Sequence, residues 1–256
     1  MSNLFIIVVL LLAAGVFIFY KGGTTRGQYV VKSGQDINAE PDMPSEQDIN
    51  IEPDMPVEFG YKCQWLAIKT DSADEVINKI KLKDVQVSSW KSGILHAYED
   101  MVFVTPPVNG WVFVVGATLP DFADNRSKRN NIEKMLIALS LYFSEVQYFG
   151  SHRVVEYHAW AKAKNGSIVR GYAYLGEQGR TLWNVGEKSS SEIELGLNYF
   201  NENSPDADDD GYWEREDLKF PDEEHVMQIA GKWSINPMKL PVMAIEKGTG
   251  FLGKLR

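Results

Sequence analysis

An aspartate-rich segment in the last quarter of the chain holds the residues best suited to chemistry. Acidic side chains stand at alternate positions of the sequence DADDD, and a glycine follows them. Calcium binds six to eight hard oxygen atoms, and a glycine at the sixth position of a twelve-residue loop lets the backbone turn sharply. The spacing therefore predicts a calcium loop whose ligands would be Asp206, Asp208, Asp210, the backbone carbonyl of Tyr212, Glu214 and Asp217.

The predicted calcium loop departs from the usual pattern in two respects. It resembles EF-hand-type loops over these twelve residues only, and Asp217 stands where such loops carry a bidentate glutamate. Pro205 and Pro221 leave little room for two long flanking helices, and no second loop occurs in the sequence to pair with it. The alternative interpretation is an acidic, solvated insertion between two helices.

A histidine-containing segment is the second candidate site. If residues 152–160 are extended, the two-residue period of a strand places His152, Glu156, His158 and Trp160 on one face. Two imidazoles and a carboxylate are able to bind zinc or to act as a general acid and base. None of them stands at the spacing of a known motif, and ordinary strand residues explain the pattern more simply.

Motifs for nucleophilic or nucleotide chemistry do not occur in the sequence. It contains no G-x-S-x-G turn, no Walker-type loop and no dinucleotide-binding glycine loop. The single cysteine, Cys63, excludes an intramolecular disulfide framework. The sequence therefore favours a protein without enzymatic activity and without a cofactor other than calcium.

The net charge of −9 over 256 residues comes from two acidic segments. Residues 33–59 contain eight acids and no base, and residues 201–224 contain eleven acids and two bases. The remainder of residues 60–256 is mildly basic, with 21 bases and 16 acids. Because a general nucleic-acid binder carries a basic excess, the acidic balance argues against nucleic acid as a partner.

Residues 4–20 form an unbroken apolar run of 17 residues. As a helix this run is about 26 Å long, enough to cross the core of a bilayer. The first three residues carry no base and no A-x-A site follows, so an uncleaved anchor over residues 1–21 is favoured over a signal peptide. Lys21, Arg26 and Lys32 follow the run, and the positive-inside rule then predicts a single-pass inner-membrane protein with a cytoplasmic body. A periplasmic body is the alternative.

Residues 22–59 are predicted to be a flexible linker. The segments QDINAEPDMP (residues 35–44) and QDINIEPDMP (residues 47–56) form a tandem repeat with a period of 12. Prolines and repelling acids predict an extended tether. The alternative is a docking motif, with Ile37 and Ile49, and Met43 and Met55, as its apolar anchors.

Residues 60–256 are predicted to form one α+β domain with a mostly antiparallel sheet, because strands and helices do not alternate regularly. Capping boxes at Ser72 and Ser189 predict two helices, the second continuing through Phe200. A further helix begins after Pro221 and is expected to end at Gly231. Residues 132–143 are apolar on nearly every side, which predicts a central buried helix. The predicted strands are residues 64–69, 101–105, 111–117, 154–164, 167–175 and 181–185, with a hairpin turn at Asn165-Gly166.

Five segments carry a resemblance to a known group of proteins: WLAIKT, GWVFVVGATLPD, YFGSHRVVEYHAW, GYAYLGEQG and IAGKWSINP. Over residues 64–237 the chain resembles a family of uncharacterised bacterial proteins, some of which resemble immunity partners of polymorphic toxins. The resemblance implies no catalytic motif, and the acidic loop at Asp206 is an insertion relative to it.

The sequence thus predicts a membrane-anchored, non-enzymatic binding module. The most concrete form is an immunity-type protein that recognises a partner protein, either a toxin or an envelope protein, aided by acidic segments that attract a basic partner. The first alternative is a calcium-binding tethered domain that uses the DxDxDG loop. The second is a metal-dependent or acid/base enzyme at the face predicted for His152, Glu156 and His158.

Overall fold

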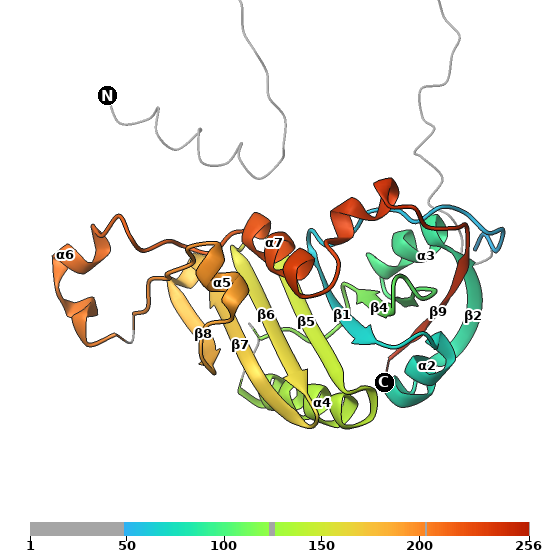
Figure 1. Ribbon diagram of the computed structural model, residues 1–256, viewed down its shortest axis with the longest axis horizontal. Coiled ribbons are helices and arrows are strands. Elements are labelled where there is room, and N and C mark those ends of the chain that lie inside the picture. Colours follow the sequence, from blue (N-terminus) through green and yellow to red (C-terminus); the bar gives the residue numbers. More distant parts are fainter. Residues whose placement is uncertain (1–48, 123–125, 203, 256) are drawn as a thin grey trace, which may run out of the picture. The chain divides into compact units, whose positions relative to one another are not determined.

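The structure, a computed structural model, describes residues 49–122, 126–202 and 204–255. The predicted membrane segment and the first copy of the repeat lie outside these residues. A nine-stranded sheet has the order β2-β9-β3-β4-β1-β5-β6-β7-β8, and its neighbouring strands are antiparallel (Figure 1). The strands are β1 (Cys63–Lys69), β2 (Lys83–Ser89), β3 (Val102–Val104), β4 (Trp111–Gly116), β5 (Glu145–His152), β6 (Tyr157–Lys164), β7 (Ser167–Leu175), β8 (Arg180–Val185) and β9 (Thr249–Lys254). The predicted α+β class with an antiparallel sheet is confirmed.

One half of the sheet is a meander of strands that follow one another in the sequence. β5, β6, β7 and β8 pair in chain order, and Asn165 and Gly166 connect β6 to β7 with φ angles of 46° and 79°. Such angles at both central residues are those of the tight hairpin turn that an Asn-Gly pair favours. The β6–β7 hairpin predicted at this turn is confirmed, and β3 and β4, which were predicted as strands, form a second hairpin.

The other half depends on pairing between distant segments. β9 comes from the end of the described chain and lies between β2 and β3. β1 lies between β4 and β5 and joins the two halves. Its residues Cys63 to Ile68 are all buried, because helices cover both faces of the sheet at this strand.

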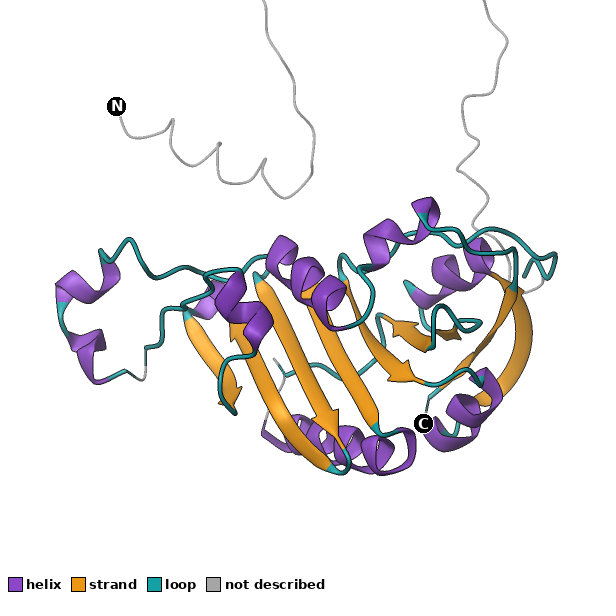
Figure 2. Cartoon of the chain, viewed as in Figure 1, coloured by secondary structure: helices purple, strands orange, loops and turns teal. Residues whose placement is uncertain are grey.

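The two faces of the sheet carry separate hydrophobic clusters. Helices lie on both sides of the sheet (Figure 2). Successive strand residues such as Trp65 and Leu66 point to opposite faces and belong to different clusters. We call one side the α4 face; it is covered by α2 (Ala73–Ile80) and α4 (Arg126–Phe143). The opposite side, the α7 face, is covered by α3 (Trp90–Ala97), α5 (Ser190–Glu194), α7 (Glu223–Trp233) and the 3-10 helix η3 (Pro237–Val242).

Three helices differ from the sequence predictions. α4 is not a central helix: Leu141 is 71% exposed, because only one side of the helix packs against the sheet. α5 ends at Glu194 rather than at Phe200, because Gly196 adopts a left-handed φ of 64° just after it. α7 passes through Gly231 and continues to Trp233, whose ring lies 5.8 Å from that of Phe149.

Residues 49–59, predicted as the end of the flexible linker, lie against the folded domain. Ser89 N donates to Asn50 O at 2.7 Å, and Gly248 N donates to Asp54 O at 3.0 Å. The side chain of Phe59 is 3% exposed and belongs to the core of the α7 face. Within the part of the chain that the structure describes, no helix is both long and apolar enough to cross a membrane.

Candidate functional site

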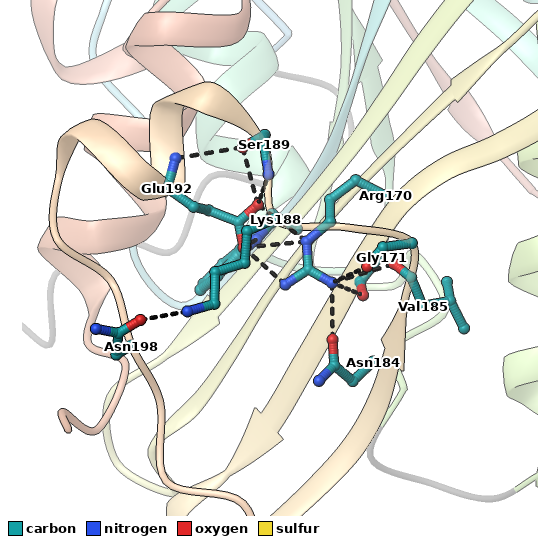
Figure 3. Close-up of polar contacts among 10 residues, drawn as sticks. Arg170, Gly171, Asn184, Val185, Lys188, Ser189, Glu192 and Asn198 are labelled. Atoms are coloured by element: carbon teal, nitrogen blue, oxygen red, sulfur yellow. Dashed lines mark hydrogen bonds and ion pairs between the residues drawn. The ribbon is translucent and has the colours of Figure 1, made fainter.

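Strand β7 places one arginine, Arg170, on the α7 face among aromatic side chains. Tyr172, two residues further along β7, lies on the same face. Helix α5 packs over Arg170 and bonds to it through Glu192. Arg170 Nη2 lies 2.7 Å from Glu192 Oε1, and Arg170 Nε lies 2.9 Å from Glu192 Oε2 (Figure 3). Because the two side chains are 4% and 0% exposed, this is a buried ion pair with the fork geometry that favours arginine.

The remaining donors of Arg170 bond to its own strand β7 and to the adjacent strand β8. Nη1 donates to Gly171 O at 3.0 Å, to Asn184 Oδ1 at 2.7 Å and to Val185 O at 3.1 Å (Figure 3). The guanidinium is therefore engaged on all sides by the protein itself. Its role is to fix the geometry of the surrounding wall, with little capacity left to bind a ligand.

Glu192 is held in place by the start of α5. Ser189 caps the helix, and its backbone N and its Oγ both donate to Glu192 Oε2 at 2.8 Å. Trp160 Nε1 donates to the other oxygen at 3.3 Å. Burial raises the pKa of Glu192, but the hydrogen bonds and charge of Arg170 and the bonds from Ser189 outweigh it, so the pKa lies below its usual range.

Three stacked aromatic rings continue from this ion pair toward the surface. Trp160 stacks on Tyr172 at 4.8 Å between ring centroids, and Tyr172 stacks on Tyr199 at 4.5 Å. The hydroxyl oxygens of Tyr172 and Tyr199 are both buried, and that of Tyr199 has no hydrogen-bond partner among the described residues. The protein itself encloses both oxygens, so the stack forms a closed aromatic layer beside the ion pair.

A pocket of about 440 Å³ opens over this stack. Arg170, Tyr172 and Tyr199 contribute to its lining, together with both ends of the acid-rich segment 200–219. Lys188 at its edge is hydrogen-bonded to Asn198 (Figure 3). The full lining is Arg170, Tyr172, Asn184, Gly186, Glu187, Lys188, Asn198, Tyr199, Phe200, Asn201, Arg215, Asp217 and Leu218. The volume and the mixed polar lining fit one side chain of a partner or a small polar ligand.

Residues 200–219, which we call the acidic excursion, leave the sheet and return to the same place. A parallel bridge pairs Tyr199 with Lys219, and Phe200 N donates to Lys219 O at 3.2 Å while Lys219 N donates to Asn198 O at 2.7 Å. Between these bonds the chain forms η2 (Pro205–Asp208) and α6 (Asp210–Trp213), which project from the sheet (Figure 1). The excursion is thus closed at its base.

The acidic excursion exposes aromatic surface among its carboxylates. Phe200 stacks with Trp213 at 5.5 Å and with Phe220 at 4.6 Å. Trp213 and Phe220 are 42% and 52% exposed, whereas Tyr212 is buried beneath them. The same segment carries eight acidic residues: Glu202, Asp206, Asp208, Asp209, Asp210, Glu214, Glu216 and Asp217. Exposed aromatic rings within a charged rim are typical of a protein-binding surface.

The residues of the predicted calcium loop all lie in this excursion but in different local structures. Asp206 and Asp208 belong to η2, whereas Asp210 and Tyr212 belong to α6. Asp217 is ion-paired with Arg215, with Nη2 and Oδ2 2.6 Å apart. Among the described residues, no three histidine, cysteine, aspartate or glutamate side chains are grouped so as to hold a metal ion. Calcium binding stays a prediction, and filling the loop requires its acids, including Glu214, to rearrange.

The structure separates the residues of the predicted histidine site. The chain reverses between β5 and β6, so residues 152–160 form a hairpin instead of one strand. His152 pairs with Tyr157 on the α4 face, whereas His158 pairs with Ser151 on the α7 face, and Glu156 lies in the turn with φ 52°. The expectation of one shared face holds for His158 and Trp160 but is wrong for His152 and Glu156, because a four-residue turn interrupts the two-residue period.

His158 nevertheless has an unusual environment. It is 2% exposed, its Nδ1 has no hydrogen-bond partner among the described residues, and burial lowers its pKa to about 4. Asp222 and Glu223 oppose this shift and His225 adds to it. The side chain is therefore a neutral, enclosed imidazole, which a substrate in solution does not reach.

Sequence reasoning missed the residues that build the pocket. The capping box of Ser189 and Glu192 is visible in the sequence, but a local motif does not reveal that Glu192 also binds Arg170. One signal was present: alternate positions of β7 read Arg170, Tyr172 and Tyr174, which places a lone arginine on an otherwise aromatic strand face. A buried arginine requires an acidic partner, so this pattern predicts a distant carboxylate.

Comparisons of the chain with family models, curated proteins and solved structures give no match.

Proposed function

We propose that this protein is a membrane-tethered, non-enzymatic binding module that recognises a basic partner protein through the acidic excursion. The observation that carries this proposal is the pair of exposed rings, Trp213 and Phe220, within or beside a segment that holds eight acids and two bases. Aromatic side chains supply most of the binding energy at protein interfaces, and surrounding charges accelerate association with a partner of opposite sign.

The arrangement of the excursion supports this assignment. The backbone bonds of Tyr199, Phe200 and Lys219 close its base, so the aromatic cluster is held on a segment whose two ends are fixed. A fixed surface loses less conformational entropy on binding than a free loop does. The partner thus meets a preformed aromatic surface at low entropic cost.

The pocket beside the excursion gives the partner a second contact. Tyr172 and Tyr199 contribute to its lining, although their hydroxyl oxygens are buried, and polar side chains complete it. A polar side chain inserted from the partner would meet the polar residues of this lining, which include Asn184, Asn198 and Arg215. We expect such an insertion to determine which partner is accepted, while the acids of the excursion determine how fast it arrives.

The most concrete partner is the toxin expected from the resemblance to immunity-type proteins. The test is co-expression of the full chain with the product of the neighbouring gene. The full chain should restore growth, and a variant carrying Trp213→Ala and Phe220→Ala should fail to do so. Leu141→Ala is the matched control, because Leu141 is equally apolar and 71% exposed but lies on the opposite face of the sheet.

The dependence of binding rates on salt distinguishes electrostatic attraction of the partner from direct contact with the aromatic rings. If carboxylates steer the partner, association should slow as ionic strength rises, while the aromatic variants mainly accelerate dissociation. The proposal fails if the neighbouring product is not toxic and no protein binds the full chain in a way that depends on Trp213. It also fails if Leu141→Ala weakens binding as much as Trp213→Ala does.

The compartment of the folded domain decides which partners it meets. We propose an anchor at residues 4–20 and a cytoplasmic body, supported by the apolar run and by Lys21, Arg26 and Lys32 after it. A reporter that is active on one side of the membrane, fused after Arg256, tests the orientation. Activity only in the periplasm would reverse it and would favour an envelope protein as the partner.

A further inference from the structure

The second copy of the repeat, residues 47–56, is bound to the folded domain where the structure describes it. Ile49 packs against the core of the α7 face, and Pro56 is buried. Asn50 O accepts a hydrogen bond from Ser89 N at 2.7 Å, and Asn50 N donates to Ser92 Oγ at 3.3 Å. This segment therefore docks with both side-chain and backbone contacts.

Asp54 makes the most specific contact of this copy. Its Oδ1 accepts from Trp90 N at 2.6 Å, and its Oδ2 accepts from Lys91 N at 3.0 Å. These amides stand in the first turn of α3, where a helix has no internal acceptor for them. The carboxylate thus caps the helix and sits at the positive end of its dipole. Asp54 also exchanges two backbone hydrogen bonds with Gly248.

The two copies of the repeat differ at one position, and that position is irrelevant to docking. Residues 35–44 read QDINAEPDMP and residues 47–56 read QDINIEPDMP, so the first copy has Ala39 at the position where the second copy has Ile51. Ile51 is 59% exposed in the docked copy. The four residues of the second copy that contact the domain have identical counterparts twelve positions earlier, namely Ile37, Asn38, Asp42 and Pro44.

We propose that the two copies are alternative occupants of one docking site, and that the first copy of the same chain replaces the second when residues 45–56 loop out. Closing a loop of twelve residues disfavours the exchanged state by about 40-fold, so the second copy is the major occupant. Phe59 stays buried in both states, because it follows the loop. Exchange shortens the tether by twelve residues, or about 40 Å of extended chain.

Amide hydrogen exchange at Trp90 and Lys91 reports the occupancy of the site, because Asp54 is the acceptor for both amides. The full chain is placed in lipid nanodiscs. In one variant Ile49→Ser and Asp54→Lys reject the second copy, since a positive charge at a helix N-terminus is unfavourable. The matched control carries Ile37→Ser and Asp42→Lys, and a third protein carries all four changes.

Protection at the two amides should be unchanged in the control variant. In the second-copy variant, protection should fall by no more than about 40-fold. The first copy then occupies the site, and the cost of closing the twelve-residue loop sets this limit. In the protein with all four changes protection should be lost. Amides of Phe113 and Phe149 in the sheet serve as a fold control, and Asp54→Ala with Asp42→Ala repeats the test if charge reversal disturbs them.

Two results would overturn the proposal. The first is equal loss of protection in the second-copy variant and in the protein with all four changes, with the sheet amides still protected. The second is protection in the second-copy variant that disappears when the number of chains per nanodisc is reduced to one. That outcome would mean that the occupant is the repeat of a neighbouring molecule.

Discussion

Arg170 and Glu192 form an ion pair that connects strand β7 to helix α5 inside the protein. The Nη2–Oε1 distance is 2.7 Å, and neither side chain is more than 4% exposed. Each charge has further hydrogen bonds, from Ser189 to the carboxylate and from the guanidinium to Asn184. Because both charges are removed from water, each is stabilised only while the other is present. The structure of the pocket wall therefore requires both side chains.

Removal of one partner should therefore destabilise the fold strongly. Glu192→Ala leaves the Arg170 charge buried and unpaired, which should lower the free energy of unfolding by about 3–5 kcal/mol in urea titrations. Glu194→Ala is the matched control on the same helix, since its pair with Lys232 is exposed and should contribute less than about 1 kcal/mol. Equal effects of the two substitutions would contradict the burial argument.

The neutral state of His158 should make stability depend on pH. Its pKa is about 4 in the folded protein, against an ordinary value of 6.5 for an exposed histidine, so the unfolded chain binds more protons between these two values. Stability should fall as the pH falls from about 6.5 toward 4, by at most about 3 kcal/mol. His158→Leu should flatten this part of a stability–pH curve measured with urea. A slope that survives the substitution unchanged would assign it to other groups.

The thiol of Cys63 should be inert in the native protein. It is fully buried, its Sγ lies 3.4 Å from the hydroxyl of Tyr98, and burial raises its pKa to about 11. Reaction with a disulfide reagent at pH 8 should be at least about 100-fold slower than that of an exposed thiol, because little thiolate is present. Cys63→Ala with Val154→Cys is the control, since Val154 is 70% exposed. Rapid labelling of native Cys63 would show that the strand opens.

Calcium binding by the excursion should depend on the Arg215–Asp217 pair. The loop needs the carboxylate that Arg215 now holds at 2.6 Å. Arg215→Gln should therefore increase the calcium affinity measured by titration calorimetry on the full chain, and Asp206→Asn with Asp208→Asn should abolish the heat. The absence of a saturable heat in both the native chain and Arg215→Gln at millimolar calcium would remove the calcium hypothesis.

The parts of the fold that follow from neighbouring residues were predictable. Asn165 and Gly166 specify a tight turn through their own backbone preferences, and Ser189 caps a helix that begins at the next residue. Such features need no information from distant residues. The mostly antiparallel character of the sheet was predicted from the order of the elements, because strands and helices do not alternate regularly along the chain.

The parts that depend on distant partners were not predictable. The contact of Asp54 with the start of α3 joins segments that composition assigns to different regions, a linker and a domain. The closure of the acidic excursion at Tyr199 and Lys219 likewise has no local signal. The exposed side of α4 illustrates the same limit, because Leu141 is apolar whether or not a partner covers it. The pattern of hydrophobic residues predicts which side chains are buried only when the elements that pack around them are known.

The position of β9 between β2 and β3 has a consequence for how the protein is made. Of the nine strands in the described part of the chain, β9 is the last that the ribosome synthesises, yet it is the neighbour to which both β2 and β3 pair. Until Thr249–Lys254 has emerged, β2 has no strand beside it, and its alternating valines, Val85 and Val87, stand on an open edge. The meander of β5 to β8 has no such dependence. During translation, the pairing among β5 to β8 is therefore available before the pairing of β2 and β3 with their common neighbour. At that stage chaperones would find an unpaired edge to bind.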